Sequence, residues 1–235
     1  MYALYRRDAE DRQQAGGYAC RVPATETRAT YHHGSLREEL ITTCVALIEA
    51  EGIGAVSLRR VAREAGVSPR APYHHFPDRS ALFAAICVRG YELLVQRLHQ
   101  TRAAAPTAAH ALGAIVEAYV LFGRDHPAHL HLMLRPELSE PDKHPQVGRA
   151  GEEAVQILTG VVEDCQRDGT APPGDPETLV GMVWALAIGI VTLWLDGPLE
   201  GRCVSLGTTP EQLTANIAAT LEALMIAARS ANPAG

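Results

Sequence analysis

The fold of this chain is decided by residues 57–76, which read SLRRVAREAGVSPRAPYHHF. Ser57 is a helix-capping residue ahead of a short amphipathic run, and Gly66 then supplies a residue that tolerates a left-handed turn. Ser68 and Pro69 follow as the cap and first residue of another short helix. This spacing predicts a helix-turn-helix, in which two short helices are joined by a tight turn.

The side chains of this stretch divide into an apolar set that faces a core and a polar set that faces outward. The apolar set is Leu58, Val61, Ala65, Val67 and Phe76. An ordinary corner in a helical protein has no reason to collect hydrogen-bond donors, whereas DNA phosphates and base edges require them on an element that enters the major groove. The pattern therefore indicates a DNA-reading element. Its outward donors are Arg59, Arg60, Arg63, Arg70, Tyr73, His74 and His75.

Together with its flanking residues, this stretch resembles the DNA-binding domain of tetracycline-repressor-type (TetR) regulators. The similar residues are 57–76, PDRSAL at 77–82, and YHHGSLR at 31–37, which is similar to the lead-in of one branch of the family. The resemblance implies a homodimer that binds a palindromic double-stranded DNA operator and responds to a small molecule. By position it implies DNA contacts from Ser57, Ser68, Arg70, Ala71, Tyr73, His74 and Arg79.

Three positions of the motif need an account of their own. Pro72 stands where the family usually has Leu, and it predicts a tight or irregular turn, because proline lacks an N–H and crowds the carbonyl of Ser68. Arg79 has independent support, because a cation at a helix N-terminus opposes the macrodipole unless a phosphate lies beside it. Tyr73 has the alternative of covering the edge of the core.

Helical periodicity dominates the whole chain, with no internal repeat and almost no strand signal. We expect an all-α fold of about nine helices, with a helix-turn-helix domain over residues 31–80 and a ligand-binding and dimerisation domain over 81–230. Ser35 is the expected N-cap of the first helix, and the proline-rich segment 135–145 is an expected loop. The expected helices cover about 35–51, 57–65, 69–76, 79–102, 107–124, 128–134, 147–167, 176–196 and 210–230.

Charge along the chain separates a head from a body. The net charge is −6; residues 31–80 hold six Arg and six acidic residues, while 81–235 hold ten basic and seventeen acidic residues. An arginine-bearing head on an acidic body suits a protein that meets DNA at one end. For residues 1–30 we expect a disordered arm, or a start codon assigned upstream of the true one. The lack of an apolar leader and the five scattered cysteines favour the cytoplasm.

Residues 179–195 carry no charge over their whole length. The acidic flanks Glu177 and Asp196 disfavour a membrane span, so we expect a buried helix in a homodimer interface, with a monomeric core helix as the alternative. VWALAIG at 183–189 is similar to a C-terminal domain named for its Trp, His and Gly, although Ile188 occupies the His position. The expected interface residues are Gly181, Ala185, Gly189, Leu193 and Leu221.

The remaining helices are expected to enclose a cavity for a hydrophobic or aromatic effector, with ordinary core packing as the alternative for each lining residue. His126, His129 and His131 suggest a metal site, but their spacing brings at most two onto one face and no Cys or carboxylate pair completes a set. We therefore expect no metal and no cofactor. The candidate lining residues are Leu94, Tyr119, Phe122, Met133, Leu158 and Trp184.

These patterns predict a cytoplasmic DNA-binding transcriptional regulator, a repressor released from its operator by a small hydrophobic effector, and not an enzyme. Activation follows from the same physics and is an alternative. Two other functions compete with it: a helical enzyme or metal-binding protein that uses the histidine cluster, and a helical interaction protein that has lost DNA binding through Pro72. No nucleophile–base pair, phosphate-binding Gly loop or metal set in the sequence supports an enzyme.

Overall fold

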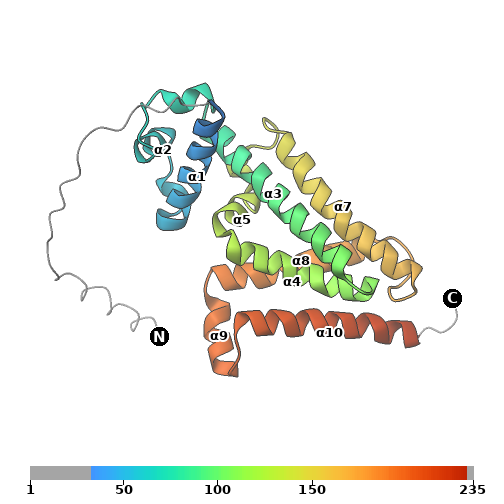
Figure 1. The fold of residues 1–235 in the computed structure, drawn as a ribbon. Helices are drawn as coiled ribbons and strands as arrows, with labels where there is room; N and C mark the ends of the chain where they lie inside the picture. Colours follow the sequence, from blue (N-terminus) through green and yellow to red (C-terminus); the bar gives the residue numbers. More distant parts are fainter. Residues whose placement is uncertain (1–32, 232–235) are drawn as a thin grey trace. The chain divides into compact units, whose positions relative to one another are not determined.

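The computed structural model describes the backbone of residues 33–231 and the side chains of residues 36–227. Within this range the chain forms ten α-helices and two short 3-10 helices, η1 (Ile53–Ala55) and η2 (Ala71–His74), which confirms the expected all-α fold (Figure 1). The expected N-terminal arm, residues 1–30, lies outside the described residues. The α-helices are α1 (His33–Glu51), α2 (Leu58–Glu64), α3 (Arg79–Ala104), α4 (Ala108–Asp125), α5 (Pro127–Met133), α6 (Pro136–Ser139), α7 (Gln146–Arg167), α8 (Glu177–Leu195), α9 (Pro198–Leu206) and α10 (Pro210–Ala231).

Several helices start at capping residues of the sequence. Ser57 and Asp78 each accept a hydrogen bond from the backbone N–H three residues further on, at 3.2 and 2.8 Å. The bond to Asp78 also lowers the pKa of its carboxyl group, because the N–H stabilises the ionised form. The expectation for Ser35 is wrong: α1 begins at His33, so Ser35 lies inside the helix rather than at its cap.

Two short helices occupy segments where none was expected. Helix α6 lies within the proline-rich segment 135–145, and α9 fills the connection between α8 and α10. Both begin with a proline, whose fixed φ suits the first turn of a helix and whose missing N–H is not needed there. Helix α6 ends after one turn, because Glu140 adopts a left-handed conformation with φ 45°. Proline marked helix starts in both places rather than loops.

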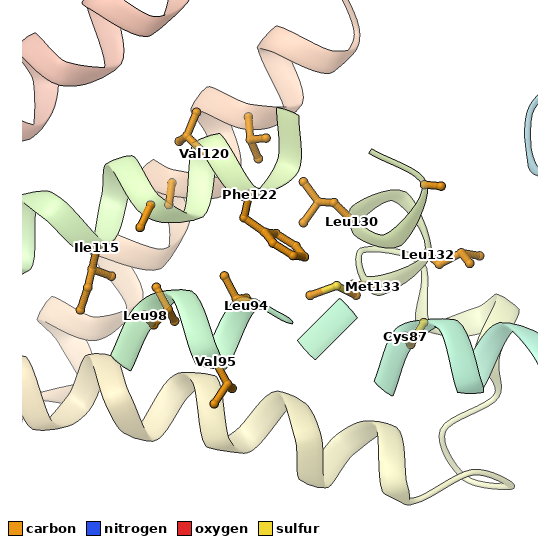
Figure 2. Packing of buried hydrophobic residues seen from close by; sticks show 14 of the residues in the cluster. Cys87, Leu94, Val95, Leu98, Ile115, Val120, Phe122, Leu130, Leu132 and Met133 are labelled. Carbon is orange, nitrogen blue, oxygen red and sulfur yellow. The ribbon is translucent and has the colours of Figure 1, made fainter. Parts of the chain in front are cut away.

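Helix α3 runs through the core of the compact unit that begins at His33. It packs against α1, α4, α5, α6 and α7. Residue 80, where the predicted domain boundary falls, lies in its first turn. Figure 2 shows Phe122 of α4 pointing between α3 and α5 toward Leu94 and Met133, and Phe122 is fully buried. One continuous apolar core therefore joins the helix-turn-helix to the rest of the described chain.

The four described cysteines are all buried, as expected for small hydrophobic residues in a core. Burial raises the pKa of the Cys44 and Cys87 thiols to about 12. These two side chains are therefore protonated at neutral pH and act as apolar groups. Cys20 lies outside the described residues.

Helix α4 lies between α8 and α10 and packs against both. Its close approach to α10 requires a glycine at position 113. A Cβ atom built on Gly113 would lie 2.6 Å from the carbonyl oxygen of Ala218, which is backbone and cannot rotate away. The absence of a Cβ atom at Gly113 thus permits the close separation of these two helices.

We expect Gly113→Ala to lower the free energy of unfolding by about 1–3 kcal/mol, because α10 must move away from α4. Urea denaturation followed by circular dichroism measures the change. The matched control is Gly148→Ala on α7, where an added Cβ meets no atom within 4 Å and the stability should stay equal or rise. Equal effects of the two substitutions would show that α10 does not depend on this close approach.

Candidate DNA interface and internal cavity

The first helix of the motif and its turn form as the sequence pattern predicts. Leu58, Val61 and Ala62 of α2 are buried. The turn is closed by a hydrogen bond of 2.9 Å from the Val67 N–H to the Ala62 carbonyl oxygen. Gly66 in this turn has φ 69°, a left-handed conformation that glycine adopts without strain.

The second element of the motif is the 3-10 helix η2 rather than an α-helix, and it begins at Ala71 with Arg70 at the cap position, so the expectation of Ser68 as cap and Pro69 as first residue is wrong. Pro72 is buried at its centre, and the surrounding hydrogen bonds run between residues three apart, including Ala71 N–H to Ser68 at 3.0 Å and Tyr73 N–H to Arg70 at 3.2 Å. The structure thus shows the tight turn expected from Pro72. A 3-10 helix winds more tightly than an α-helix, so its side chains leave the backbone at different angles. The directions of the DNA-facing side chains therefore cannot be copied from an α-helical relative.

Six of the seven residues expected at the DNA are exposed, and they lie on the α2–η2 motif and the first turn of α3. Ala71 is the exception, because it is half-buried beneath the others. Tyr73 keeps 49% of its surface exposed, which argues against the alternative of a core-covering role. The structure therefore presents a donor-rich surface. Its exposed members are Ser57, Ser68, Arg70, Tyr73, His74 and Arg79.

The arginines on and beside this surface differ in whether their charges are already paired with carboxylates of the protein. Arg60 of α2 pairs with Glu51 at 2.5 Å and Glu64 at 3.7 Å, so its charge is already balanced. Arg63 also reaches Glu64. Within the described residues, Arg59 and Arg70 have no ion pair. These two guanidinium groups are the ones free to approach phosphates.

Arg79 begins α3 and is held in place by its surroundings. Its guanidinium donates a hydrogen bond of 3.4 Å to the Val56 carbonyl oxygen and lies 5.3 Å from the centre of the Phe83 ring. Since the helix dipole disfavours a cation at this position, the neighbouring carbonyl and ring offset part of that cost. Arg79 is exposed and fixed in direction, so an approaching phosphate meets an oriented donor.

An internal cavity of about 430 Å³ lies between α3, α4, α5, α7 and α8. Five of the six residues expected to line an effector cavity surround it, and they come from all five helices. Phe122 does not line it: this side chain turns into the core beside α5, and that expectation is corrected. Sequence reasoning missed Tyr91, Glu152 and Glu177, since periodicity does not show which polar residues border an internal space. The expected residues at the cavity are Leu94, Tyr119, Met133, Leu158 and Trp184.

Four of the five residues expected at a dimer interface lie exposed on α8. Gly181, Ala185, Gly189 and Leu193 are exposed on α8, whereas Leu221 of α10 is half-buried against the core. Among the described helices, α8 alone has the length and apolar composition to cross a membrane, and 33% of its apolar window is buried. Within one chain, α8 is therefore covered on only part of its surface. The expectation that a second subunit covers the rest stays a prediction. The same helix also exposes the large side chains of Met182 and Trp184.

The three histidines singled out in the sequence do not come together with other metal ligands. In residues 33–231 no group of three or more His, Cys, Asp or Glu side chains could hold a metal ion. His129 of α5 is 6% exposed, and neither ring nitrogen has a hydrogen-bond partner among the described residues. Burial, the His126 ring and the Arg89 charge together lower the pKa of His129 to about 4. His129 is therefore a neutral core residue at pH 7.

Comparison with known proteins places both halves of the chain in one family. Residues 40–86 match the family described as bacterial regulatory proteins of the tetR family, and residues 112–224 match the tetracyclin repressor-like C-terminal domain. The chain belongs to the TetR family. As a TetR-family transcriptional regulator it binds DNA and is not an enzyme. The donor-rich surface of α2 and η2 lies within the first matched segment.

Three similar proteins show how far the resemblance extends. A Rhodococcus sp. RHA1 protein of unknown function has 31% identity and a TM-score of 0.68, over 83% of this chain and 97% of that one. FadR from Bacillus subtilis, solved in complex with stearoyl-CoA, shares the fold at 16% identity and a TM-score of 0.62, over 81% and 98%. The nucleoid occlusion factor SlmA of Haemophilus ducreyi is 27% identical over 92 residues, 39% of this chain and 46% of that protein. The chain thus matches less than half the length of this curated relative.

We expect Arg79→Ala to reduce the slope of log binding constant against log salt concentration by about one, because one phosphate contact is lost. Fluorescence anisotropy with operator DNA at several salt concentrations measures the slope. Arg149→Ala, which removes an exposed arginine from α7, is the control and should leave the slope unchanged. A slope that Arg79→Ala does not alter would remove this residue from the interface.

Buried His129 makes the protein less stable in acid. Because the folded-state pKa is about 4 against 6.5 for an unperturbed histidine, the unfolded chain binds the additional proton between these values, and stability is lost as the pH falls through this window. His129→Leu should reduce the decrease in the free energy of unfolding between pH 6.5 and pH 4. Urea titrations across this range test it, and an unchanged pH dependence would mean that the ring is protonated in the folded protein.

Proposed function

We propose that the protein is a cytoplasmic, homodimeric repressor that leaves a palindromic operator when a small hydrophobic effector enters the internal cavity. The supporting observation is that the cavity touches both helices that such a switch must connect. Helix α3 begins at the DNA surface with Arg79 and reaches the cavity with Leu94 and Leu98. Helix α8 borders the cavity with Val183, and its uncovered face adjoins the cavity, because Gly181 and Trp184 are exposed and also line it.

The uncovered face of α8 supports a second copy of the chain as its partner. Gly181 and Gly189 have open space where a Cβ would stand, so a facing helix can approach their backbone closely. Leu224 of α10 adds a further exposed apolar side chain, with 62% of its surface uncovered. An isologous interface places the same patch of each subunit against the other, and α8 and α10 of two subunits would make a four-helix arrangement.

Release from DNA then follows from a change in the distance between two recognition elements. A palindromic operator offers half-sites one helical turn, or a multiple of it, apart. An effector lowers DNA affinity only to the extent that it binds the wrongly spaced state more tightly than the DNA-competent state. Wedging α7 and α8 away from α3 is the movement that an occupied cavity favours.

Three further possibilities within the family concern the direction of regulation, the subtype of the C-terminal domain and the effector. An activator uses the same change of spacing with the opposite preference, and footprinting with and without ligand separates the two. The similarity of residues 183–199 to the Trp-His-Gly type of C-terminal domain remains a proposal, with Ile188 in place of the His. An acyl-CoA effector is suggested by the FadR complex, and it requires a cavity that accepts an anionic ligand.

The proposed function is tested by footprinting the protein's own promoter region with increasing concentrations of hydrophobic compounds. We expect a protected palindrome whose protection is lost when a ligand binds. Protection that no compound alters, together with absence of ligand binding in a thermal-shift assay, would contradict an effector-controlled repressor.

Ala185→Asp should convert the dimer to a monomer and weaken operator binding by about a hundredfold, because the second half-site no longer assists the first. The dimer is lost because the new carboxylate would be desolvated at the centre of the interface. Analytical ultracentrifugation and anisotropy measure the two effects. Ala103→Asp, at an exposed position of α3, is the matched control, and a dimer that survives Ala185→Asp would place the interface elsewhere.

A further inference from the structure

The charged groups around the cavity are of one sign. Among the 18 described residues that line it, Glu152 of α7 and Glu177 of α8 are the two charged ones, and none is Lys, Arg or His. Both glutamates are exposed, so they stand where the cavity meets solvent. Neither has an ion-pair partner within the described residues. The cavity is therefore an apolar space that carries two uncompensated negative charges.

Helix position explains one of these charges but not the other. Glu177 is the first residue of α8, where the helix dipole favours a carboxylate. Glu152 lies well inside α7 and gains nothing comparable. No nearby arginine neutralises it: Arg149 of α7 is not among the lining residues, and Arg102 of α3 is already paired with Asp164 at 2.6 Å.

Three aromatic rings complete the surroundings of the cavity. Tyr91 of α3, Tyr119 of α4 and Trp184 of α8 all border it. Burial raises the pKa of the Tyr119 hydroxyl, with the nearby Trp184 side chain lowering it in part, so this hydroxyl is neutral at pH 7 and adds no charge to the cavity. Ring faces attract cations within about 6 Å, most strongly when the cation is poorly hydrated. Aromatic rings with nearby carboxylates are the groups that bind organic ammonium ions.

We propose that the effector is an amphipathic organic cation. Its apolar part lies among Leu94, Leu98 and Leu158, and its positive group lies at the mouth between Glu152 and Glu177. An anionic ligand of the same shape would place its charge beside two carboxylates with no lining cation to balance it, which is unfavourable at any dielectric constant. The inference rests on the proposed role of the cavity as the effector site and adds the charge of the ligand.

The test uses three probes with the same decyl chain: decyltrimethylammonium, decanol and decanoate, all below their micelle concentrations. The chain has two tryptophans, so Trp194→Phe leaves Trp184 at the cavity as the only one, and its fluorescence reports binding. Calorimetry on the unsubstituted protein is the second measurement. We expect the cation to bind about tenfold or more tightly than the anion, with the alcohol between them.

Glu152→Gln combined with Glu177→Gln should remove most of this preference and leave decanol binding unchanged. Glu153→Gln is the matched control, because Glu153 is exposed on α7 next to Glu152 and does not line the cavity. Decanoate binding as tightly as the cation would overturn the inference, and so would equal losses from the control and the double substitution.

The same probes separate this inference from the proposed function. A cation that binds at the cavity with the expected preference but does not release the operator supports the ligand class and contradicts the repressor switch. An operator released by decanoate alone supports the switch and overturns the ligand class. Absence of binding by all three probes overturns the inference, while the footprint of the promoter region decides the regulator independently.

Discussion

Continuous burial of one face of α3 is the constraint on which the rest of the structure depends. The helix has 26 residues and is therefore about 39 Å long. Leu82 and Phe83 in its first part are fully buried beside the helix-turn-helix, while Leu94 and Leu98 lie at the cavity. Because protein interiors are close-packed, such a helix cannot bend locally without opening voids. A shift of its far half therefore moves its first turn, and Arg79 with it.

The pairing of carboxylates with arginines also differs between the two ends of α3. Near the DNA surface, acidic side chains such as Glu51 and Glu64 are engaged by Arg60, which leaves Arg59 and Arg70 to meet phosphates. Around the cavity the relation is reversed, because the carboxylates have no partner there. The two ends of α3 therefore differ in whether nearby carboxylates are paired, and net charge alone would not have shown this.

Small residues decide where helices come close and where they do not. Gly113 brings α4 against the backbone of α10, and this contact is completed within one chain. Gly181 and Gly189 on α8 meet nothing, although they are the same residue type on an even more apolar helix. An apolar surface of this kind is costly in water, so its lack of cover within the chain supports a partner with the same chemistry.

Sequence alone determined the helical class, the helix-turn-helix and most of the residues on its outer surface. These features depend on local rules: caps at Ser57 and Asp78, a turn glycine at position 66, and the constraint of Pro72 on its own turn. The proline-rich segment 135–145 was interpreted as a loop, but Pro136 begins α6, because the residue type that ends one helix can also begin another. Ser35 was misplaced because a capping residue also occurs inside helices.

Tertiary structure decided what local rules cannot express. Whether Phe122 faces a cavity or a core depends on helices far from it in sequence, and so does the placement of Glu152 and Glu177 around one cavity. The same holds for α8, whose uniform apolarity predicts burial but not which face α4 covers and which face is left open. Periodicity shows how a helix divides into faces, whereas the identity of each neighbour comes from packing between segments that are distant along the chain.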